Sequence, residues 1–266
     1  MEPLRVALAQ TDVILGSPEA NRVRLPEWAE RAAAAGARLL LLPELWNVGY
    51  AQERWATLGA SLTDGAGDDL ALAARQFGLY VVASVLERHG DALHNTAVLF
   101  SPEGDLLGTY RKAHLVPLFE EDRYLRAGQS LTFLDLPWGR VGLAVCYDLR
   151  FPELFRAYAL GGAVGVLLVA EWPQDRIEHW SVLVQARAIE NEFFVVACNR
   201  VGQDESGEFG GRSMVVGPWG EVLVEGVAAE ALLVADIDVS QVRLTRDRLP
   251  VLNDRRPDLY GALVER

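Results

Sequence analysis

The feature that most constrains the fold of this sequence is its alternation of short apolar runs with amphipathic segments. A run such as Val141–Val145 is typical of a buried strand, whereas Pro152–Leu160 has the helical period and begins at a proline that suits a first helical turn. Strands that alternate with helices predict an α/β fold. The predicted strands are Leu4–Gln10, Arg38–Leu42, Leu79–Leu86, Ala97–Phe100, Asp105–Tyr110, Val141–Val145, Val164–Val169, Phe193–Cys198, Ser213–Val216, Glu221–Val224 and Leu232–Ile237. The predicted helices run from Pro18 toward Gly36 and over Asp68–Phe77, Pro152–Leu160 and Glu178–Asn191.

The length and composition of the chain fit one domain. It has 266 residues, of which 50% are hydrophobic, and this is enough to bury a sizeable core. No linker rich in Pro, Gly or Ser divides it, so we expect a single domain over residues 1–266. From about Asp247 the periodicity is lost and Pro250, Pro257 and Gly261 follow, which predicts a C-terminal arm.

The net charge of −12 and the pI near 4.8 argue against nucleic-acid binding, which needs clustered cations. No segment reaches the roughly 18 apolar residues that a spanning helix needs, so we expect no membrane contact. The first residues lead directly into the strand Leu4–Gln10 and lack the pattern of a secretory signal. We therefore expect a cytoplasmic protein.

Few residues are available for metal or disulfide chemistry. The two cysteines are too few for a disulfide framework or a cysteine-rich zinc site, and the four histidines have no metal-ligand spacing. The sequence also lacks the Walker loop, the Gly-x-Ser-x-Gly elbow and the His-Glu-x-x-His motif. We expect no metal and no organic cofactor.

A short sequence pattern occurs twice. The turn Ser101–Gly104 and the turn Gly217–Gly220 each lie between two strand-like segments, and their prolines are 116 residues apart (218 − 102). The segment Leu39–Trp46 similarly resembles Val166–Trp172. Either the chain has two related halves that form two packed sheets, or the chemistry of turns simply recurs.

Each of the two cysteines ends an apolar strand. Cys146 precedes Pro152, a helix start, so its thiol would lie near backbone N–H groups that lower a thiol pKa and hold an oxyanion. Cys198 is almost as well placed, and most free cysteines are simply buried apolar residues. Position alone does not choose between them.

Two glutamates and one lysine have comparable settings. Glu44 and Glu171 each end an apolar strand, where partial desolvation raises a carboxyl pKa toward the range of a general base. The alternative for either is an ordinary loop carboxylate. Lys112 follows a strand; beside a thiolate and a carboxylate it would stabilise an oxyanion, but a lone loop lysine is usually solvated.

Three separated blocks resemble the nitrilase (carbon–nitrogen hydrolase) superfamily. The blocks are Pro43-Glu44, Tyr110–Leu115 and Cys146–Glu153, and the likeness extends from Val6–Gln10 to Leu232–Ile237. The resemblance implies an α-β-β-α four-layer sandwich and a catalytic triad of Glu44, Lys112 and Cys146. It therefore favours Glu44 over Glu171 and Cys146 over Cys198. It also implies homodimers and a further catalytic glutamate, which we assign to Glu121 rather than to Glu120.

Further residues resemble the ω-amidase branch, which hydrolyses the ω-amides of small 2-oxo dicarboxylic acids such as 2-oxoglutaramate and 2-oxosuccinamate. They are Glu171-Trp172-Pro173, His179-Trp180 and Ala186–Asn191. The substrate carboxylate needs a cation, for which Arg150 is the first candidate and Arg187 or Arg200 the next; a structural ion pair is the alternative for Arg150. The other predicted substrate contacts are Tyr147, Trp172 and His114.

The resemblance implies a reaction through a cysteine thioester. Glu44 would be the base, and Lys112 with the Tyr147 N–H would hold the oxyanion. The alternatives are another carbon–nitrogen substrate (an N-carbamoyl compound, a glutathione-derived amide or a nitrile) or a non-catalytic binding or regulatory protein on the same fold.

Overall fold

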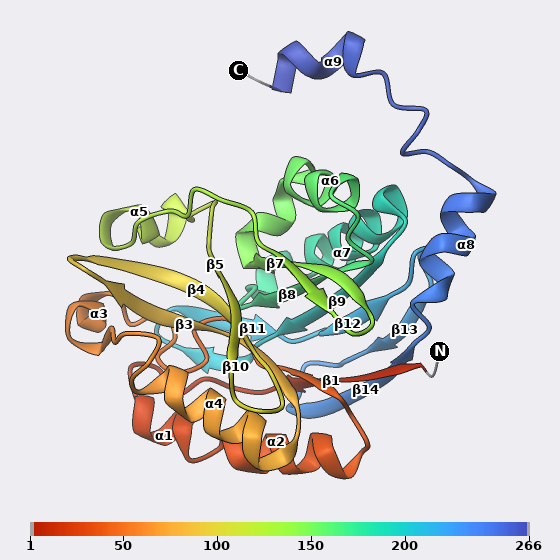
Figure 1. The fold of residues 1–266 in the computed structure, drawn as a ribbon. Helices are drawn as coiled ribbons and strands as arrows, with labels where there is room; N and C mark the ends of the chain where they lie inside the picture. Colours follow the sequence, from red (N-terminus) through yellow and green to blue (C-terminus); the bar gives the residue numbers. More distant parts are fainter. Residues whose placement is uncertain (1–2, 265–266) are drawn as a thin grey trace.

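The computed structural model describes residues 3–264 and has two six-stranded β-sheets packed face to face between layers of helices (Figure 1). Figure 1 shows α2 (Leu25–Ala34) and α4 (Ala66–Phe77) on the outside of one sheet. It shows α6 (Pro152–Leu160) and α7 (Ile177–Asn191) on the outside of the other. The predicted α-β-β-α four-layer sandwich is therefore confirmed.

The first sheet has the strand order β14-β1-β2-β3-β4-β5. Its strands β1, β2 and β3 are parallel, and antiparallel strands flank them on both sides. The strands are β1 (Leu4–Gln10), β2 (Leu39–Leu41), β3 (Tyr80–His89), β4 (Ala92–Phe100), β5 (Leu106–Arg111) and β14 (Ala231–Ile237).

The second sheet repeats this arrangement with the order β6-β7-β8-β9-β12-β13. Here β7, β8 and β9 form the parallel part. The turns at residues 101–104 and 217–220 join β4 to β5 and β12 to β13, which are equivalent places. This equivalence favours two related halves over a chance recurrence of turns. The strands are β6 (Phe133–Leu136), β7 (Gly139–Val145), β8 (Gly165–Ala170), β9 (Phe194–Asn199), β12 (Met214–Val216) and β13 (Val222–Glu225).

Both faces of the central strands are buried, which explains their continuous apolar runs. On β1, Val6 and Leu8 belong to the core between the sheets, whereas Ala7 and Ala9 pack in the core beneath the outer helices. Successive side chains of a strand point to opposite faces, so each layer of core takes alternate residues.

The remaining elements are short and connect or follow the sheets. They are α1 (Pro18–Arg22), α3 (Gln52–Leu58), α5 (Glu121–Tyr124), α8 (Ser240–Arg248), α9 (Pro257–Val264), β10 (Val201–Asp204), β11 (Gly207–Gly210) and three 3₁₀ segments, η1 (Pro117–Phe119), η2 (Cys146–Arg150) and η3 (Gln174–Arg176). No helix within residues 3–264 is long and apolar enough to cross a membrane. The single domain with a C-terminal arm stays a prediction.

Two local expectations were wrong. The helix expected from Pro18 to Gly36 is two helices, α1 and α2, because Pro26 has no N–H for the carbonyl of Arg22 and its ring clashes with that turn. Between Cys198 and Ser213, where no element was predicted, Val201–Asp204 and Gly207–Gly210 form the paired strands β10 and β11.

The third difference is the early start of β4. It begins at Ala92 rather than Ala97 and pairs with the extended end of β3 through a tight turn at Gly90, whose φ is +58°. The strand ends contain His89 and His94 instead of an apolar run, so the hydrophobic pattern did not indicate them.

Candidate active site

Residues that follow three different strands meet between the two sheets. Glu44 follows β2 and Lys112 follows β5 in the first sheet, and Cys146 follows β7 in the second. The Nζ of Lys112 lies 2.8 Å from Oε1 of Glu44, and both side chains are fully buried. Burial shields this ion pair from water and makes its geometry well defined.

The carboxylate of Glu44 is held by four hydrogen bonds. Oε1 accepts from Lys112, from the hydroxyl of Tyr50 at 3.0 Å and from the side-chain amide of Asn95 at 2.7 Å. Oε2 accepts from the backbone N–H of Glu171 at 2.8 Å. The carboxylate therefore has one fixed orientation, as a general base requires.

Lys112 also contacts the second predicted glutamate. Its Nζ lies 2.9 Å from both carboxyl oxygens of Glu121. Burial lowers the pKa of Lys112, but the charges of Glu121 and Glu44 raise it by more, so the pKa lies above its ordinary value. Lys112 is thus a fixed ammonium ion between Glu44 and Glu121.

Glu121 is buried, whereas Glu120 is exposed and pairs with Arg123. The Oε2 of Glu121 accepts from the N–H of Val116 at 2.7 Å. Burial raises the pKa of Glu121, and the Lys112 charge opposes that rise. The structure therefore brings Glu121, and not Glu120, to the lysine.

Cys146 has a left-handed backbone, with φ of +44°, at the turn from β7 into η2. This conformation is costly for a residue other than glycine and is typical of functional positions. Burial and the charge of Glu44 raise the pKa of the thiol, while Lys112 opposes the rise. The resting group is therefore a thiol that needs a base.

Asp148 fixes the turn that carries Cys146. Its Oδ2 accepts from the N–H of Val145 and from the hydroxyl of Tyr110, both at 2.9 Å, and its Oδ1 accepts from the N–H of His114 at 3.1 Å. These bonds tie the turn that carries Cys146, after β7 of the second sheet, to β5 of the first.

Cys198 lies within β9 and has a different environment. Its Sγ is 3.5 Å from the carbonyl oxygens of Ala9 and Leu41, and burial raises the pKa of its thiol. Within residues 3–264 no carboxylate or amine makes a hydrogen bond to this Sγ. Cys198 is packed between the sheets, and the structure separates the two cysteines that position alone did not.

A cavity of about 350 Å³ opens onto Cys146. Tyr147, Arg150 and Trp172, all predicted as substrate contacts, line it. The guanidinium of Arg150 lies over the Trp172 ring, 4.7 Å from its centre. The rest of the wall is made by η1, η3 and their neighbours, namely Val116, Pro117, Leu118, Phe119, Pro173 and Arg176.

The other predicted contacts lie outside this wall. His114 bonds to Oδ1 of Asp148 through Nδ1 at 2.7 Å and stacks on Phe151. Arg187 is buried and bonds to the carbonyl of Leu149. These two side chains support the turn that carries Cys146.

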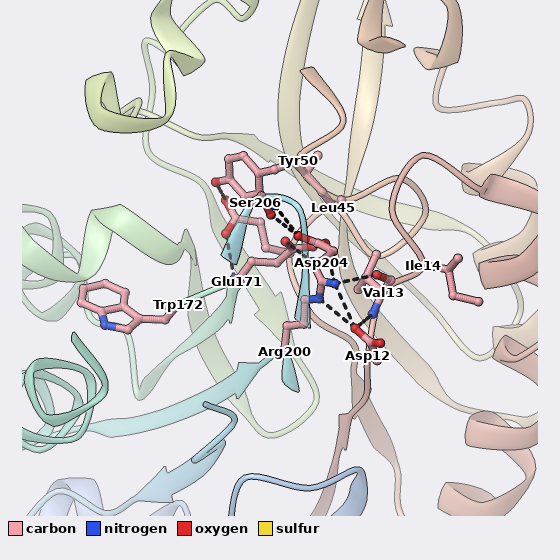
Figure 2. A network of polar contacts seen from close by, with 12 residues as sticks. Asp12, Val13, Ile14, Leu45, Tyr50, Glu171, Trp172, Arg200, Asp204 and Ser206 are labelled. Carbon is pink, nitrogen blue, oxygen red and sulfur yellow. Dashed lines mark hydrogen bonds and ion pairs between the residues drawn. The ribbon is translucent and has the colours of Figure 1, made fainter. Parts of the chain in front are cut away.

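Arg200 and Glu171, two further candidates, form a buried ion pair at 2.9 Å. Figure 2 shows Arg200 between Asp12, Asp204 and Glu171, with Trp172 pointing away from it. Arg200 is therefore paired with these three carboxylates, and it is not among the residues that line the cavity.

Sequence reasoning missed three residues of the site: Tyr50, Asn95 and Arg176. Tyr50 follows Glu44 by six residues, and Asn95 lies within a strand whose start was not predicted. The Arg176 guanidinium lies 5.7 Å from the centre of the Phe119 ring and lines the cavity. Asn95 lies before the predicted start of its strand, so its place on a buried strand was not visible in the sequence.

Comparisons with known proteins agree with this geometry. Residues 5–247 match the family model described as Carbon-nitrogen hydrolase. The chain is 37% identical over 256 residues to the 2-oxoglutaramate amidase of Bacillus subtilis, covering 96% of this chain and 98% of that protein. It is 31% identical over 280 residues to the omega-amidase NIT2 of Homo sapiens, covering all of both chains (100%).

Solved structures show the same likeness. A superfamily protein from Xanthomonas campestris superposes with a TM-score of 0.91 and 29% identity over 96% of this chain and 98% of that one. The amidase of Nesterenkonia sp. AN1 superposes with a TM-score of 0.87 and 31% identity over 98% of this chain and 99% of that one, in a structure that shows Michael addition of acrylamide at its active-site cysteine.

Proposed function

Since the chain belongs to the carbon–nitrogen hydrolase family, we propose that it is a thiol amidase acting on the ω-amide of a small 2-oxo dicarboxylic acid. The observation that carries the proposal is the buried Glu44–Lys112 pair, whose charges act on the Cys146 thiol. Cys146 in turn lines a cavity together with Arg150 and Arg176. In this proposal Cys146 is the nucleophile and Glu44 is the base. Lys112, which contacts Glu121, is the cation beside them. The products are the dicarboxylic acid and ammonia.

The first half of the reaction forms a thioester. Glu44 takes the thiol proton as the Sγ of Cys146 bonds to the amide carbon, and the carbonyl electrons move onto oxygen. Lys112 Nζ and the Tyr147 N–H hold this oxyanion, each contributing roughly 3–4 kcal/mol. The carbon–nitrogen bond then breaks, and the protonated Glu44 gives its proton to the leaving ammonia.

The second half releases the acid. A water molecule loses a proton to Glu44 and attacks the thioester carbon. The intermediate expels the sulfur of Cys146, which recovers a proton from Glu44. The two halves use the same base and the same oxyanion contacts, so one fixed carboxylate serves both.

Two cations on the cavity wall favour a substrate with a carboxylate. Arg150 has no ion-pair partner among residues 3–264, and its guanidinium is held over Trp172. Arg176 pairs through Nε with the exposed Asp175 at 3.3 Å. Because Arg150 lacks a protein carboxylate, its charge is available to the substrate; the names of the amidases from Bacillus subtilis and Homo sapiens support the same substrate class.

Ammonia release from a small panel tests the substrate. We expect turnover of 2-oxoglutaramate and 2-oxosuccinamate, and much slower release from butyramide, a neutral amide, and from a nitrile or an N-carbamoyl compound. Arg150→Gln should raise KM for the carboxylate-bearing amides at least about tenfold, the value of one charged contact. The same variant should leave butyramide hydrolysis unchanged. Equal rates on neutral and anionic amides would overturn the substrate assignment but would leave the assignment of amidase activity intact.

The assembly and location belong to the same proposal. We propose a homodimer of single-domain subunits with a C-terminal arm from about residue 247, in the cytoplasm, where the two free thiols stay reduced. Light scattering of the purified protein should give a mass near twice the 29.2 kDa of one chain. A monomer at micromolar concentration would refute the dimer.

A further inference from the structure

The two carboxylate oxygens of Glu44 are held by different parts of the molecule. Oε1 accepts from Lys112, Tyr50 and Asn95, all in the first half of the chain. Oε2 accepts a hydrogen bond from the N–H of Glu171, which follows β8 in the second sheet. The position of the Glu171 backbone therefore fixes one half of the base.

The side chain of Glu171 anchors that backbone. Its Oε2 lies 2.9 Å from Nη1 of Arg200, and its Oε1 is buried without a hydrogen-bond partner. Arg200 is itself held by the carbonyl of Val13 at 2.7 Å and by Asp12 at 2.9 Å (Figure 2). Because Asp12 and Val13 follow β1, the anchor ties the second sheet to the first.

The charges around this anchor do not balance. Arg200 lies within ion-pair distance of three carboxylates, namely Glu171, Asp12 and Asp204. One guanidinium cannot neutralise three carboxylates, and the unpartnered Oε1 of Glu171 is the atom where a buried charge costs most. A proton on Glu171 removes that cost.

We propose that Glu171 is a positioning residue for Glu44: its Arg200-anchored backbone orients the base, and its carboxyl group keeps a proton while the base works. This inference rests on Glu44 acting as the base of the proposed amidase. Glu171 touches neither the substrate cavity nor the sulfur, and it acts through Glu44.

The electrostatics support the proposal. Burial raises the pKa of Glu171 to about 8, the charge of Arg200 opposes the rise, and the charge of Glu44 adds to it. The groups that face this pair of glutamates are Lys112, Glu121, Tyr50 and Cys146 on the Glu44 side, and Arg200, Asp12 and Asp204 on the other. The pKa values of Cys146 and Tyr50 lie well above their ordinary values, so these groups keep their protons near pH 8.

The pH profile of activity is the decisive measurement. As pH rises through about 8, Glu171 loses its proton, and the new negative charge beside Glu44 opposes formation of the oxyanion. We expect kcat/KM to decline there in the unmodified protein. Glu171→Gln mimics the protonated acid, so it should stay within about twofold of the unmodified kcat at pH 7 and lose the decline near pH 8.

Two aspartate variants complete this test. Asp204→Asn removes a charge that raises the pKa of Glu171, so the decline should move to lower pH. Asp135→Asn, which removes a charge from an exposed pair with Arg140, is the matched control and should leave the profile unchanged. A purely structural role would not shift the profile in opposite senses for Glu171→Gln and Asp204→Asn.

Glu171→Ala tests the anchor itself. Without the contact to Arg200 the N–H is no longer held in place, so kcat should fall about tenfold while KM stays within about twofold. Circular dichroism at each pH separates this effect from unfolding, and Asp204→Asn keeps the inference testable if the alanine variant does not fold.

The inference is overturned if Glu171→Gln keeps the decline near pH 8, or if Glu171→Ala turns over at the unmodified rate. Alkylation of Cys146 by iodoacetamide, followed over the same pH range, reports the charge of the site without any substrate. An inflection in alkylation that Glu171→Gln removes, in a protein that hydrolyses no amide, would contradict the proposed function and leave the positioning role intact.

Discussion

The two six-stranded sheets have the same strand order, and each places a glutamate after the middle strand of its parallel part. Glu44 follows β2 and Glu171 follows β8. Both are fully buried, and the backbone of one bonds to the carboxylate of the other. Equivalent positions in two similar halves thus hold a proposed base and a proposed positioning residue.

The neighbours of the two glutamates account for this difference. Glu44 is paired with Lys112, and its charge acts on the Cys146 thiol. Glu171 is paired with Arg200, which three carboxylates share. The fold topology brings both glutamates to the interface between the sheets. The two sites differ in the cation paired with each glutamate, which is Lys112 for Glu44 and Arg200 for Glu171.

The largest expected effect separates the two cysteines of the second sheet. Cys146→Ala should lower turnover by at least about 10⁴-fold, since losing a nucleophile removes the covalent route. Cys198→Ala should leave kcat within about twofold and lower the free energy of unfolding by about 1 kcal/mol. Ammonia release and urea denaturation measure the two effects. A covalent adduct of the substrate at Cys198 would reverse the assignment.

The next effect separates the two glutamates at neutral pH. Glu44→Gln should reduce kcat by about 10²–10⁴-fold, because an amide cannot accept the thiol proton. Glu171→Gln at the same pH should be nearly as active as the unmodified protein. Comparable losses in both variants would mean that the two halves share the role of base.

A smaller effect concerns the pH dependence of stability. The pKa of Glu171 is raised to about 8 in the folded protein and is about 4.3 in an unfolded chain. Between these values the folded state holds a proton that the unfolded state releases, so stability falls as pH rises, by at most about 1.4 kcal/mol per pH unit.

Urea denaturation at pH 5, 6.5 and 8 measures this slope for the unmodified protein and for Glu171→Gln (about one proton is involved). The slope should be smaller in the variant. Parallel curves would show that Glu171 is already ionised in the folded state.

The smallest effect compares the two equivalent turns. Gly104 and Gly220 have φ of +84° and +90°, which cost other residues about 1 kcal/mol or more. In Gly104→Ala the new methyl group would lie 2.8 Å from the carbonyl oxygen of Ala71, which is backbone. In Gly220→Ala it would meet the side chain of Ile189, which is exposed and has room to move toward solvent. Thermal melts should show a larger loss for Gly104→Ala, with activity unchanged in both. Equal losses would mean that the backbone φ alone sets the cost.

Much of the fold could be predicted from the sequence because strands buried on both faces are continuous apolar runs. The strand ends at Glu44 and Cys146 were visible for the same reason. The extension of β3 and β4 and the pair β10–β11 were not, because these segments are partly polar and owe their pairing to register and turns rather than to burial.

The convergence of the site depends on tertiary distances that no local pattern contains. Glu44 and Lys112 are 68 residues apart in sequence, and Glu44 and Glu171 are 127 apart. The family resemblance supplied the first pairing. It did not supply the second. Arg200 was therefore considered as a partner of the substrate carboxylate rather than as the ion-pair partner of Glu171.

The placement of Cys146 on one sheet and of Glu44 and Lys112 on the other has a consequence for how activity appears during folding. Neither sheet alone carries both the proposed nucleophile and the proposed base, so a chain in which only one sheet has formed has no complete site. Recovery of amidase activity after dilution from urea should therefore follow the last step, in which the two sheets dock. Until then the Cys146 thiol has neither the proposed base nor the proposed oxyanion contacts, so a folding chain does not turn over amides.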